Sequence, residues 1–195
     1  MSEDRRILKS KKALKESLIA LMKQRSIKQI TITSLAAHAD VNRSTFYQHY
    51  SSIDDLFQKL TEDVMEDLIR AYREPYIGSD RIIFSELSAT SIKIFEHIYS
   101  YADFYSVILD TAIFTGFQER ICSLIKQLTL HELMEDSPQD INAELYASYH
   151  AHAITGLIVS WVSEGFKFTP EYMNEQLIKI LNFHPGSSKV RLEES

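Results

Sequence analysis

The sequence predicts an all-α protein, and three observations support that fold class. The 195 residues include only five Gly and four Pro, so few positions would interrupt a helix. Apolar residues recur at helical spacing, whereas β-branched runs with strict alternation are rare. No strand–helix–strand rhythm is present. We therefore expect about nine helices, arranged as a small three-helix domain, a connecting fourth helix and a larger helical C-terminal domain.

Charge is distributed unevenly along the chain. Residues 1–50 carry ten Lys and Arg against four Asp and Glu, whereas residues 51–195 carry eleven against twenty-three. The net charge of −6 therefore hides a basic head on an acidic body. Such a division predicts that the head alone binds nucleic acid.

The first helix is expected over residues 7–24, after a short polar arm. Leu14, Leu18, Leu21 and Met22 recur at helical spacing and form its apolar stripe. Basic residues crowd its beginning, where they oppose the helix dipole. They form either a solvated face or a set of phosphate contacts, and both interpretations stay open.

Two short helices with a tight break between them follow. The first is expected over residues 34–39, with Thr33 as its N-cap. The turn is Asp-Val-Asn at residues 40–42, because Asp and Asn tolerate a left-handed backbone better than most residues. The second helix begins at Arg43 or Ser44 and ends at Tyr50. This pattern predicts a helix-turn-helix.

The second of these helices separates a buried face from an outer face. At 100° per residue, Phe46 and Tyr50 share the buried side, while Ser44, Tyr47 and Gln48 lie outward. A solvent-exposed helix face usually mixes Glu with Lys, but this face carries hydroxyl, phenol and amide groups. Those groups suit phosphates and base edges.

A connecting helix is expected over residues 53–75. Ser52 and Asp55 have the spacing of a capping box at its start, and Pro75 ends it. Its apolar stripe comprises Leu56, Leu60, Val64 and Leu68. We divide the chain into a helix-turn-helix domain (1–52), this helix (53–75), a helical C-terminal domain (81–184) and a polar tail (185–195).

The C-terminal domain is expected to contain five helical segments. One long helix follows a turn at residues 135–138, and the last helix begins with Thr169 as N-cap and Pro170 at its first position. The expected ranges are 81–100, 102–110, 113–133, a long helix ending near 164, and 170–182.

From residue 30 the sequence reads I-T-I-T-S-L-A-A-H-A-D-V-N-R-S-T-F-Y-Q-H-Y-S-S-I-D-D-L-F. This stretch resembles the DNA-binding segment of TetR/AcrR-type bacterial transcriptional regulators, and the similarity extends over about residues 8–68. The family usually has Gly where Asp40 lies and often Lys where Ile53 lies. The resemblance therefore implies a turn that is either slightly strained or re-aimed, and one missing phosphate contact.

The DNA-contacting residues follow from the outer face and from this resemblance. Thr33 and the N-terminus of its helix can hold a phosphate through backbone N–H groups. The resemblance implies phosphate contacts for Tyr47 and His49. The candidates for base reading are Arg43, Ser44, Thr45 and Gln48.

The dimer surface is expected on the last two helices, which the resemblance implies form a four-helix bundle with a second copy. The C-terminal part is loosely similar to a subgroup of the family common in Firmicutes. Small residues along the long helix permit close helix approach, and Trp is a favoured interface anchor. An intramolecular core position is the alternative for each residue. The candidates are Ala147, Ala151, Gly156, Leu157, Ser160 and Trp161.

An effector pocket is expected inside the C-terminal domain, lined by aromatic side chains with Tyr and His as its polar groups. Aromatic residues at helical spacing also form plain core, which is the alternative. The candidates are Phe95, Tyr99, Phe104, Tyr105, Phe114, Phe117, Tyr146, Tyr149 and His150.

Other classes of function have little support. The single Cys122 excludes an internal disulfide, and the sequence contains no G-x-S-x-G, P-loop or C-x-x-C motif. His150 and His152 are two residues apart and do not share a helix face, so a metal site is not expected. We expect no catalytic residues, no cofactor, no signal peptide and no membrane span.

The expected function is a cytoplasmic, homodimeric regulator that associates with the nucleoid when it binds DNA. It would bind a palindromic operator as a repressor, and an unknown small-molecule effector would release it. The alternative is a DNA-bound adaptor or activator whose C-terminal domain docks a protein.

Overall fold

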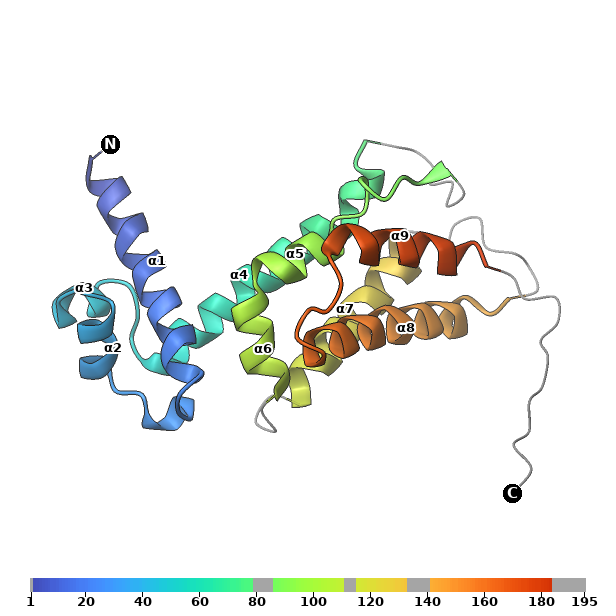
Figure 1. Ribbon diagram of the computed structural model, residues 1–195. Helices are drawn as coiled ribbons and strands as arrows, with labels where there is room; N and C mark the ends of the chain where they lie inside the picture. Colours follow the sequence, from blue (N-terminus) through green and yellow to red (C-terminus); the bar gives the residue numbers. More distant parts are fainter. Residues whose placement is uncertain (1, 79–85, 111–114, 133–140, 184–195) are drawn as a thin grey trace, which may run out of the picture.

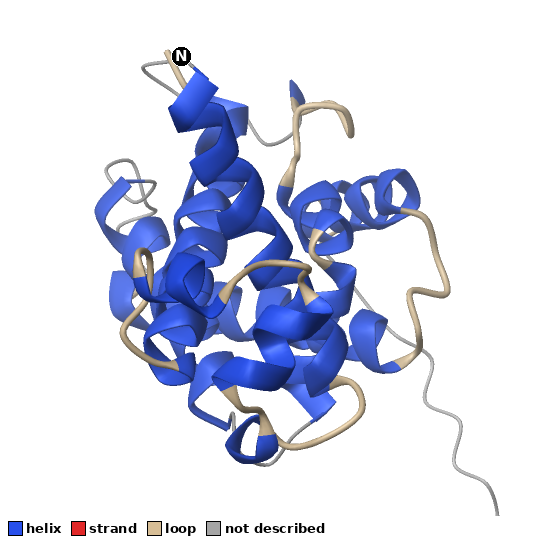
Figure 2. Cartoon of the chain, turned by 90° about the vertical axis from the view of Figure 1, so that its left-hand side faces the viewer, coloured by secondary structure: helices blue, strands red, loops and turns tan. Residues whose placement is uncertain are grey.

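The computed structural model describes residues 2–78, 86–110, 115–132 and 141–183. Over these ranges the chain is all-helical, as the sequence predicts, with nine α-helices and no strand (Figure 2). The α-helices are α1 (Ser2–Met22), α2 (Ile32–His38), α3 (Arg43–Tyr47), α4 (Ile53–Arg73), α5 (Ile94–Ser100), α6 (Ala102–Asp110), α7 (Thr115–Glu132), α8 (Ala143–Ser163) and α9 (Pro170–Leu181). Two 3-10 helices accompany them, η1 (Ile27–Gln29) and η2 (Glu74–Tyr76).

The molecule has a head and a body (Figure 1). Helices α1, α2 and α3 form the head, α4 runs from the head into the body, and α5 to α9 form the body. In the body, α7 and α8 make the most extensive helix pair, while α5 packs on α9. Helix α6 contacts both α8 and α1, so it reaches back to the head.

Most of the expected helices lie where the sequence places them. Helix α6 has the predicted bounds, Thr169 caps α9, and Ser52 caps α4 by accepting a hydrogen bond from the Asp55 N–H. Helix α1 begins earlier than expected, and α3 ends at Tyr47 rather than Tyr50. The expected turn at 135–138 and the polar tail lie outside the described residues.

The expected helix over residues 81–100 is wrong for its described part before α5. Residues 87–93 form turns and loop, and the helix begins only at Ile94. The Ser88 hydroxyl lies 2.8 Å from those of both Thr90 and Ser91. Such local hydroxyl bonding offers the chain an alternative to a helix, which periodicity alone does not reveal.

One apolar cluster runs through head and body. Leu56, Leu60, Val64 and Leu68 are buried in it, as the predicted stripe of the connecting helix requires. The far end of α4 is fixed to α7, because the Tyr72 hydroxyl lies 2.8 Å from the Thr129 hydroxyl.

A second connection joins the end of α4 to α7. Arg73 forms a bidentate ion pair with Glu132, and Tyr76 donates its hydroxyl to the same carboxylate at 2.9 Å. The Arg73 guanidinium holds the pKa of Glu132 below its usual value. Any displacement of this end of α4 must therefore break or move these contacts.

Buried His97 should make folding stability depend on pH. Burial, with help from Arg70, lowers the pKa of His97 from 6.5 to about 4, and its Nε2 lies 3.0 Å from the Tyr105 hydroxyl. Because the folded pKa lies below the unfolded one, the unfolded chain takes up this proton first. Stability should therefore fall by ~3 kcal/mol as pH drops from 6.5 to 4.

Urea unfolding of wild type and His97→Gln at about pH 7 and about pH 4.5 measures this loss. Gln can keep a hydrogen bond to Tyr105 but does not titrate, so the loss should be smaller in the variant. His150 also has a lowered pKa, so a smaller loss of stability at low pH should remain in the His97→Gln variant. Equal losses in the two proteins would refute the assignment to His97.

Candidate nucleic-acid interface

The break between α2 and α3 is a helix end closed by backbone hydrogen bonds. The Val41 N–H donates to the Ala36 carbonyl at 3.0 Å, and the Asp40 N–H donates to the Ala37 carbonyl at 3.3 Å. This pair of bonds is a Schellman motif, which needs a left-handed residue at its centre. Asp40 supplies it with φ of 52°, where Gly would fit without strain. The predicted turn is therefore confirmed, and Asp40 is its left-handed residue.

The cap of α2 lies two residues before the predicted one. Thr31, not Thr33, is the N-cap: its side chain accepts from the Ser34 N–H at 3.1 Å, and the Ser34 hydroxyl accepts from the Thr31 N–H at 3.2 Å. Ile30 before the cap and Leu35 after it are both buried, as in a hydrophobic staple. The sequence T-I-T-S offered this signal, because Ser34 lies three residues after Thr31.

Helix α3 is held by its inner face. Phe46 is fully buried and Tyr50 nearly so, as predicted, and the Tyr50 N–H closes the end of the helix on the Phe46 carbonyl at 2.9 Å. The Tyr47 ring stands edge-on to Phe46 at 5.6 Å, yet the Tyr47 side chain is 54% exposed. The inner face thus fixes the direction in which the outer side chains point.

The seven candidate DNA contacts lie close together on the head. Five are exposed and two are half-buried, and within the described residues Arg43 has no acidic partner. Burial and the nearby Lys11 lower the pKa of His49, so it is neutral near pH 7 and can donate a hydrogen bond without carrying charge. The exposed residues are Thr33, Arg43, Ser44, Tyr47 and Gln48, and the half-buried ones are Thr45 and His49.

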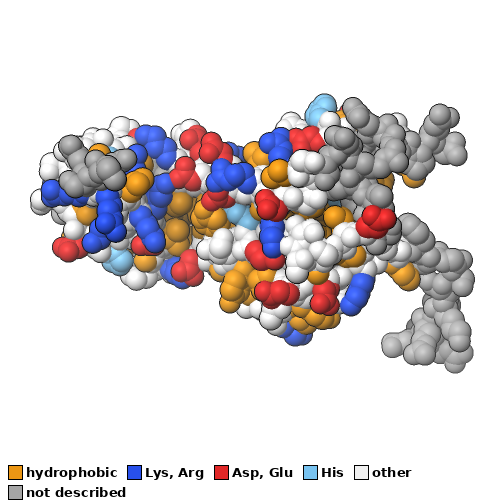
Figure 3. Space-filling view, turned by 90° about the horizontal axis from the view of Figure 1, so that it is seen from above, with side chains coloured by type: hydrophobic (Ala, Val, Ile, Leu, Met, Phe, Trp, Pro, Cys, Tyr) orange, Lys and Arg blue, Asp and Glu red, His pale blue; other side chains and the backbone are white. Residues whose placement is uncertain are grey.

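Lys and Arg side chains gather on the head (left in Figure 3), whereas the body mixes both signs. Arg5, Arg6 and Lys9 are exposed on the first turns of α1. Further along the same helix, Lys15 pairs with Asp63 of α4. The first turns of α1 and the exposed Arg43 of α3 therefore carry positive charge that is available for an anionic partner.

The junction of α3 with α4 is rigidly built. The Asp55 carboxylate accepts from the Ser51 N–H at 2.7 Å, and this bond holds the pKa of Asp55 below its usual value. Lys59 pairs with Asp55 and lies 5.4 Å over the Tyr50 ring. Ile53 is half-buried against the core. Where the family resemblance leads one to expect Lys, this chain therefore has a packing residue.

The predicted aromatic pocket residues that the structure describes divide between the core and the surface. Phe95, Phe104, Tyr105 and Phe117 are buried in the core, where several of them contact one another edge to face. The helical periodicity of these residues predicts that they are buried. It does not distinguish residues that pack in the core from residues that line a pocket. Tyr99 and Tyr149 are exposed, Tyr146 is half-buried, and Phe114 lies outside the described residues.

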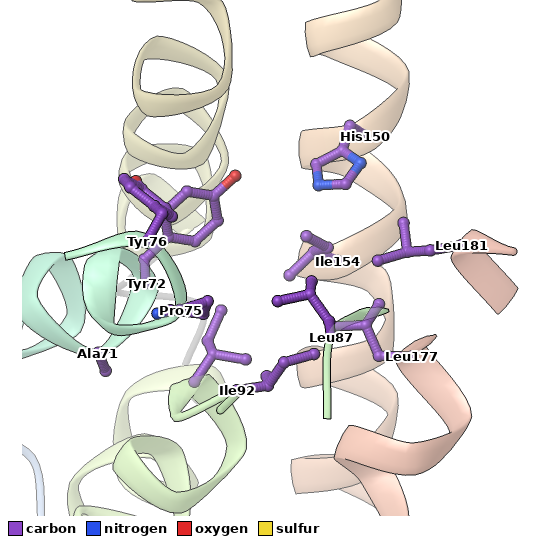
Figure 4. Close-up of a pocket in the computed structure, with 11 residues that line it drawn as sticks. Ala71, Tyr72, Pro75, Tyr76, Leu87, Ile92, His150, Ile154, Leu177 and Leu181 are labelled. Atoms are coloured by element: carbon purple, nitrogen blue, oxygen red, sulfur yellow. The ribbon is translucent and has the colours of Figure 1, made fainter. Parts of the chain in front are cut away.

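A different set of residues lines a cavity in the body (Figure 4). The cavity holds about 60 Å³ and lies between the end of α4, η2, the segment before α5, α8 and α9. Of the predicted pocket residues, His150 alone is among those that line it. The lining residues are Ala71, Tyr72, Pro75, Tyr76, Leu87, Ile92, Ile94, His150, Ile154, Leu177 and Leu181.

Half of the predicted dimer residues face the interior of the subunit. Ala147, Ala151 and Trp161 are buried, and Trp161 donates its indole N–H to the Phe168 carbonyl at 3.0 Å. These three are therefore intramolecular core, the alternative considered for them. Gly156 and Ser160 are exposed and Leu157 is half-buried.

Helix α8 presents an exposed stripe at helical spacing, of which only Gly156 and Ser160 were predicted from the sequence. The sequence signal for the stripe was the recurrence of uncharged residues at spacings of three and four. Leu145 is 71% exposed and Tyr149 is 74% exposed, so the stripe is partly apolar. The stripe comprises Leu145, Tyr149, His152, Ala153, Gly156 and Ser160.

The residues that the structure describes provide neither a metal site nor a membrane-spanning helix. No cluster of three His, Cys, Asp or Glu side chains is placed to hold a metal ion there. Among the helices described, none has the length and hydropathy that a membrane crossing requires.

Two family profiles match the chain. "Bacterial regulatory proteins, tetR family" matches residues 16–60, and "Transcriptional regulator C-terminal region" matches residues 85–183. The Bacillus subtilis (strain 168) protein described as "Uncharacterized HTH-type transcriptional regulator YxbF" is 23% identical over 169 residues. That match covers 87% of this chain but 44% of the relative, so the chain spans less than half of the relative's length.

Solved structures share the fold. A TetR transcriptional regulator from Streptococcus agalactiae 2603V is 22% identical, with a TM-score of 0.54 over 93% of this chain and 98% of that one. A TetR-like regulator from Rhodococcus sp. RHA1 is 17% identical, with a TM-score of 0.62 over 88% and 92%. NalD of Pseudomonas aeruginosa, described as the secondary repressor of the MexAB-OprM multidrug efflux pump, is 16% identical, with a TM-score of 0.58 over 90% and 96%.

Proposed function

Because the chain belongs to the TetR family of DNA-binding transcriptional regulators, we propose that it acts as a homodimeric repressor which a small-molecule effector releases from a palindromic operator. Two copies of α3 would enter successive major grooves, about 34–36 Å apart. The observation that carries this proposal is the outer face of α3, which is exposed, free of acidic residues and held from behind by Phe46 and Tyr50.

The residues of this face divide into two roles. Arg43, Ser44, Thr45 and Gln48 would read base edges, since Arg and Gln form bidentate pairs with guanine and adenine. The side chains of Thr33, Tyr47 and His49 would contact phosphates, which position the protein without reading sequence. The exposed basic residues at the start of α1 would add attraction that weakens as salt increases.

Two substitutions in α3 separate these roles. Gln48→Ala should weaken binding to the preferred operator by about 1–3 kcal/mol and relax the preference at one base pair. Tyr47→Phe removes only the hydroxyl and keeps the ring against Phe46, so it should weaken binding to all sequences alike. Fluorescence anisotropy with an operator identified by genome-wide DNA pull-down, and with its single-base variants, measures both effects.

The control is Gln127→Ala. Gln127 is exposed on α7, far from the head. This substitution should leave both affinity and preference unchanged. If neither α3 variant alters binding at moderate salt, the assignment of α3 as the recognition helix is refuted.

We further propose that the exposed stripe of α8 pairs with its copy in a second subunit, together with exposed apolar residues of α9. Tyr172, Ile180 and Phe183 of the α9 segment are 44%, 51% and 68% exposed. Exposed apolar residues that align along neighbouring helices are typical of an interface. A bundle of two helices from each subunit would cover them.

An effector would act through α4. Ala71 and Tyr72 of α4 line the cavity, while Leu56 and Leu60 of the same helix pack in the head. A ligand that fits one position of α4 better than another shifts the population of subunit arrangements by its difference in affinity. Since a cavity is present in the body, the small-ligand hypothesis has support that the protein-docking alternative lacks.

A further inference from the structure

The cavity in the body is lined almost entirely by hydrocarbon. Only Tyr72, Tyr76 and His150 among its lining residues carry a polar side-chain atom. The two tyrosine hydroxyls are engaged with α7, since that of Tyr72 lies 2.8 Å from Thr129 Oγ1 and that of Tyr76 donates to Glu132 at 2.9 Å. Their rings therefore line the cavity while their polar atoms are satisfied elsewhere.

The His150 imidazole is the remaining polar group. It projects from α8 toward the space between α4 and α9 (Figure 4), and the Tyr146 ring stacks on it at 5.9 Å. Its ring nitrogens make no hydrogen bond to any residue that the structure describes. Burial lowers the pKa of His150, so at neutral pH it is uncharged and offers one donor and one acceptor.

Among the residues that the structure describes, no charged side chain lines the cavity. Arg73, which follows Tyr72 on α4, pairs with Glu132, and Tyr76 also donates to that carboxylate. A carboxylate or ammonium ligand would therefore lose its hydration without gaining a counter-charge, which costs far more than placing a neutral polar group there.

We propose that this cavity takes an uncharged, compact molecule with an apolar body and a single hydroxyl or carbonyl group, which hydrogen-bonds to His150. This inference rests on the proposed function, because the molecule would be the effector of the regulator. The hydrocarbon lining recognises its body, and His150 selects its polar group.

Because the cavity is small, ligand binding should be coupled to the position of α4. Its space of about 60 Å³ is well below the roughly 300 Å³ of a typical ligand site. A molecule the size of one aromatic ring must therefore separate α4 and η2 from α8 and α9. Tyr72, Arg73 and Tyr76 fix that end of α4 to α7, so the ligand would act against these contacts.

Four probes of similar size test the ligand class on the full chain. They are 4-methylphenol, toluene, benzoate and benzylammonium, titrated near neutral pH by isothermal calorimetry. In wild type, 4-methylphenol should bind about fivefold more tightly than toluene, and the two ions should not bind measurably.

Variants of His150 identify the polar contact. His150→Leu should lower 4-methylphenol affinity to that of toluene without weakening toluene, and His150→Gln should restore part of the difference. The matched control is His131→Leu, which is exposed on α7 and should change neither. An ion that binds as tightly as the phenol, equal losses for phenol and toluene in His150→Leu, or no binding of any probe overturns the inference.

Operator binding separates this inference from the proposed function. If 4-methylphenol binds with the expected dependence on His150 and also lowers operator affinity, both are supported. If the binding pattern holds but operator affinity is unchanged, the ligand class is supported and effector release is refuted.

Discussion

Replacing Gly156 by Arg should turn the protein into a monomer and lower its operator affinity by ~10²-fold or more. Gly156 lies on the exposed stripe of α8, and a Cβ built there meets no atom within 4 Å. The subunit therefore has room for the larger side chain, and Arg favours the helix over Gly by about 1 kcal/mol. In the proposed dimer the same position faces the partner, where an unpaired guanidinium would clash and lose its hydration.

The expected loss of operator affinity comes from the loss of the second DNA-binding head, not from a change within the head itself. A dimer engages two half-sites, and the second contact is made at high effective concentration, whereas a monomer keeps only one. Light scattering after size-exclusion chromatography gives the oligomeric state, and anisotropy gives the operator affinity. Circular dichroism checks that helix content is unchanged.

A second helical glycine provides the matched control. Gly116 is exposed near the start of α7, and its Cβ would also meet nothing within 4 Å. Gly116→Arg makes the same change of size, charge and helix propensity away from the stripe, so it should stay dimeric and bind the operator as wild type does. A dimeric Gly156→Arg, or an equally monomeric Gly116→Arg, would place the interface elsewhere.

The head could be largely predicted from sequence because its information is local. The spacing of Phe46 and Tyr50 identifies the inner face of α3, and Asp40 has a side chain that tolerates the left-handed position of the turn. The cap was misplaced because Thr31 and Thr33 both suit an N-cap. Only the reciprocal bond with Ser34 distinguishes them.

The cavity in the body could not be predicted from the sequence, because its position depends on which helices pack against one another. Periodicity identifies Phe104 and Phe117 as buried, but their contact, with ring centroids 5.5 Å apart, joins α6 to α7 and fills the core. The cavity instead forms where α4, α8 and α9 come together, and Leu177 and His150 lie 27 positions apart in sequence. No short motif joins residues so distant in the chain.

Trp161 shows the same limit of sequence-based prediction for the dimer surface. It is a typical interface residue by composition, but its ring packs edge-on to Phe95 at 5.5 Å and to Phe166 at 5.0 Å inside the subunit. The exposed face of α8 lies on the opposite side, around Gly156. The sequence thus predicted α8 as a pairing helix, but it did not show which face of α8 is exposed.

Phe46→Ala should abolish operator binding although Phe46 is fully buried in the head and presents no atom to DNA. The substitution removes a ring that contacts both Tyr47 and Tyr50, with centroids 5.6 Å and 5.8 Å away. Emptying such a site costs about 3–5 kcal/mol, a large part of the stability of a typical domain. Because α3 has only five residues, it has little stability of its own and depends on this anchor.

Urea unfolding and operator anisotropy on the same samples test this dependence. Ile77→Ala is the control: it truncates an apolar side chain that is 65% exposed and lies outside both the head and the proposed dimer surface, so stability should change by less than about 0.5 kcal/mol. Phe46→Leu keeps most of the buried volume and should cost about 1.5 kcal/mol, with binding largely retained. If Phe46→Ala binds the operator as wild type does, the inner anchor of α3 is not what directs its outer face toward DNA.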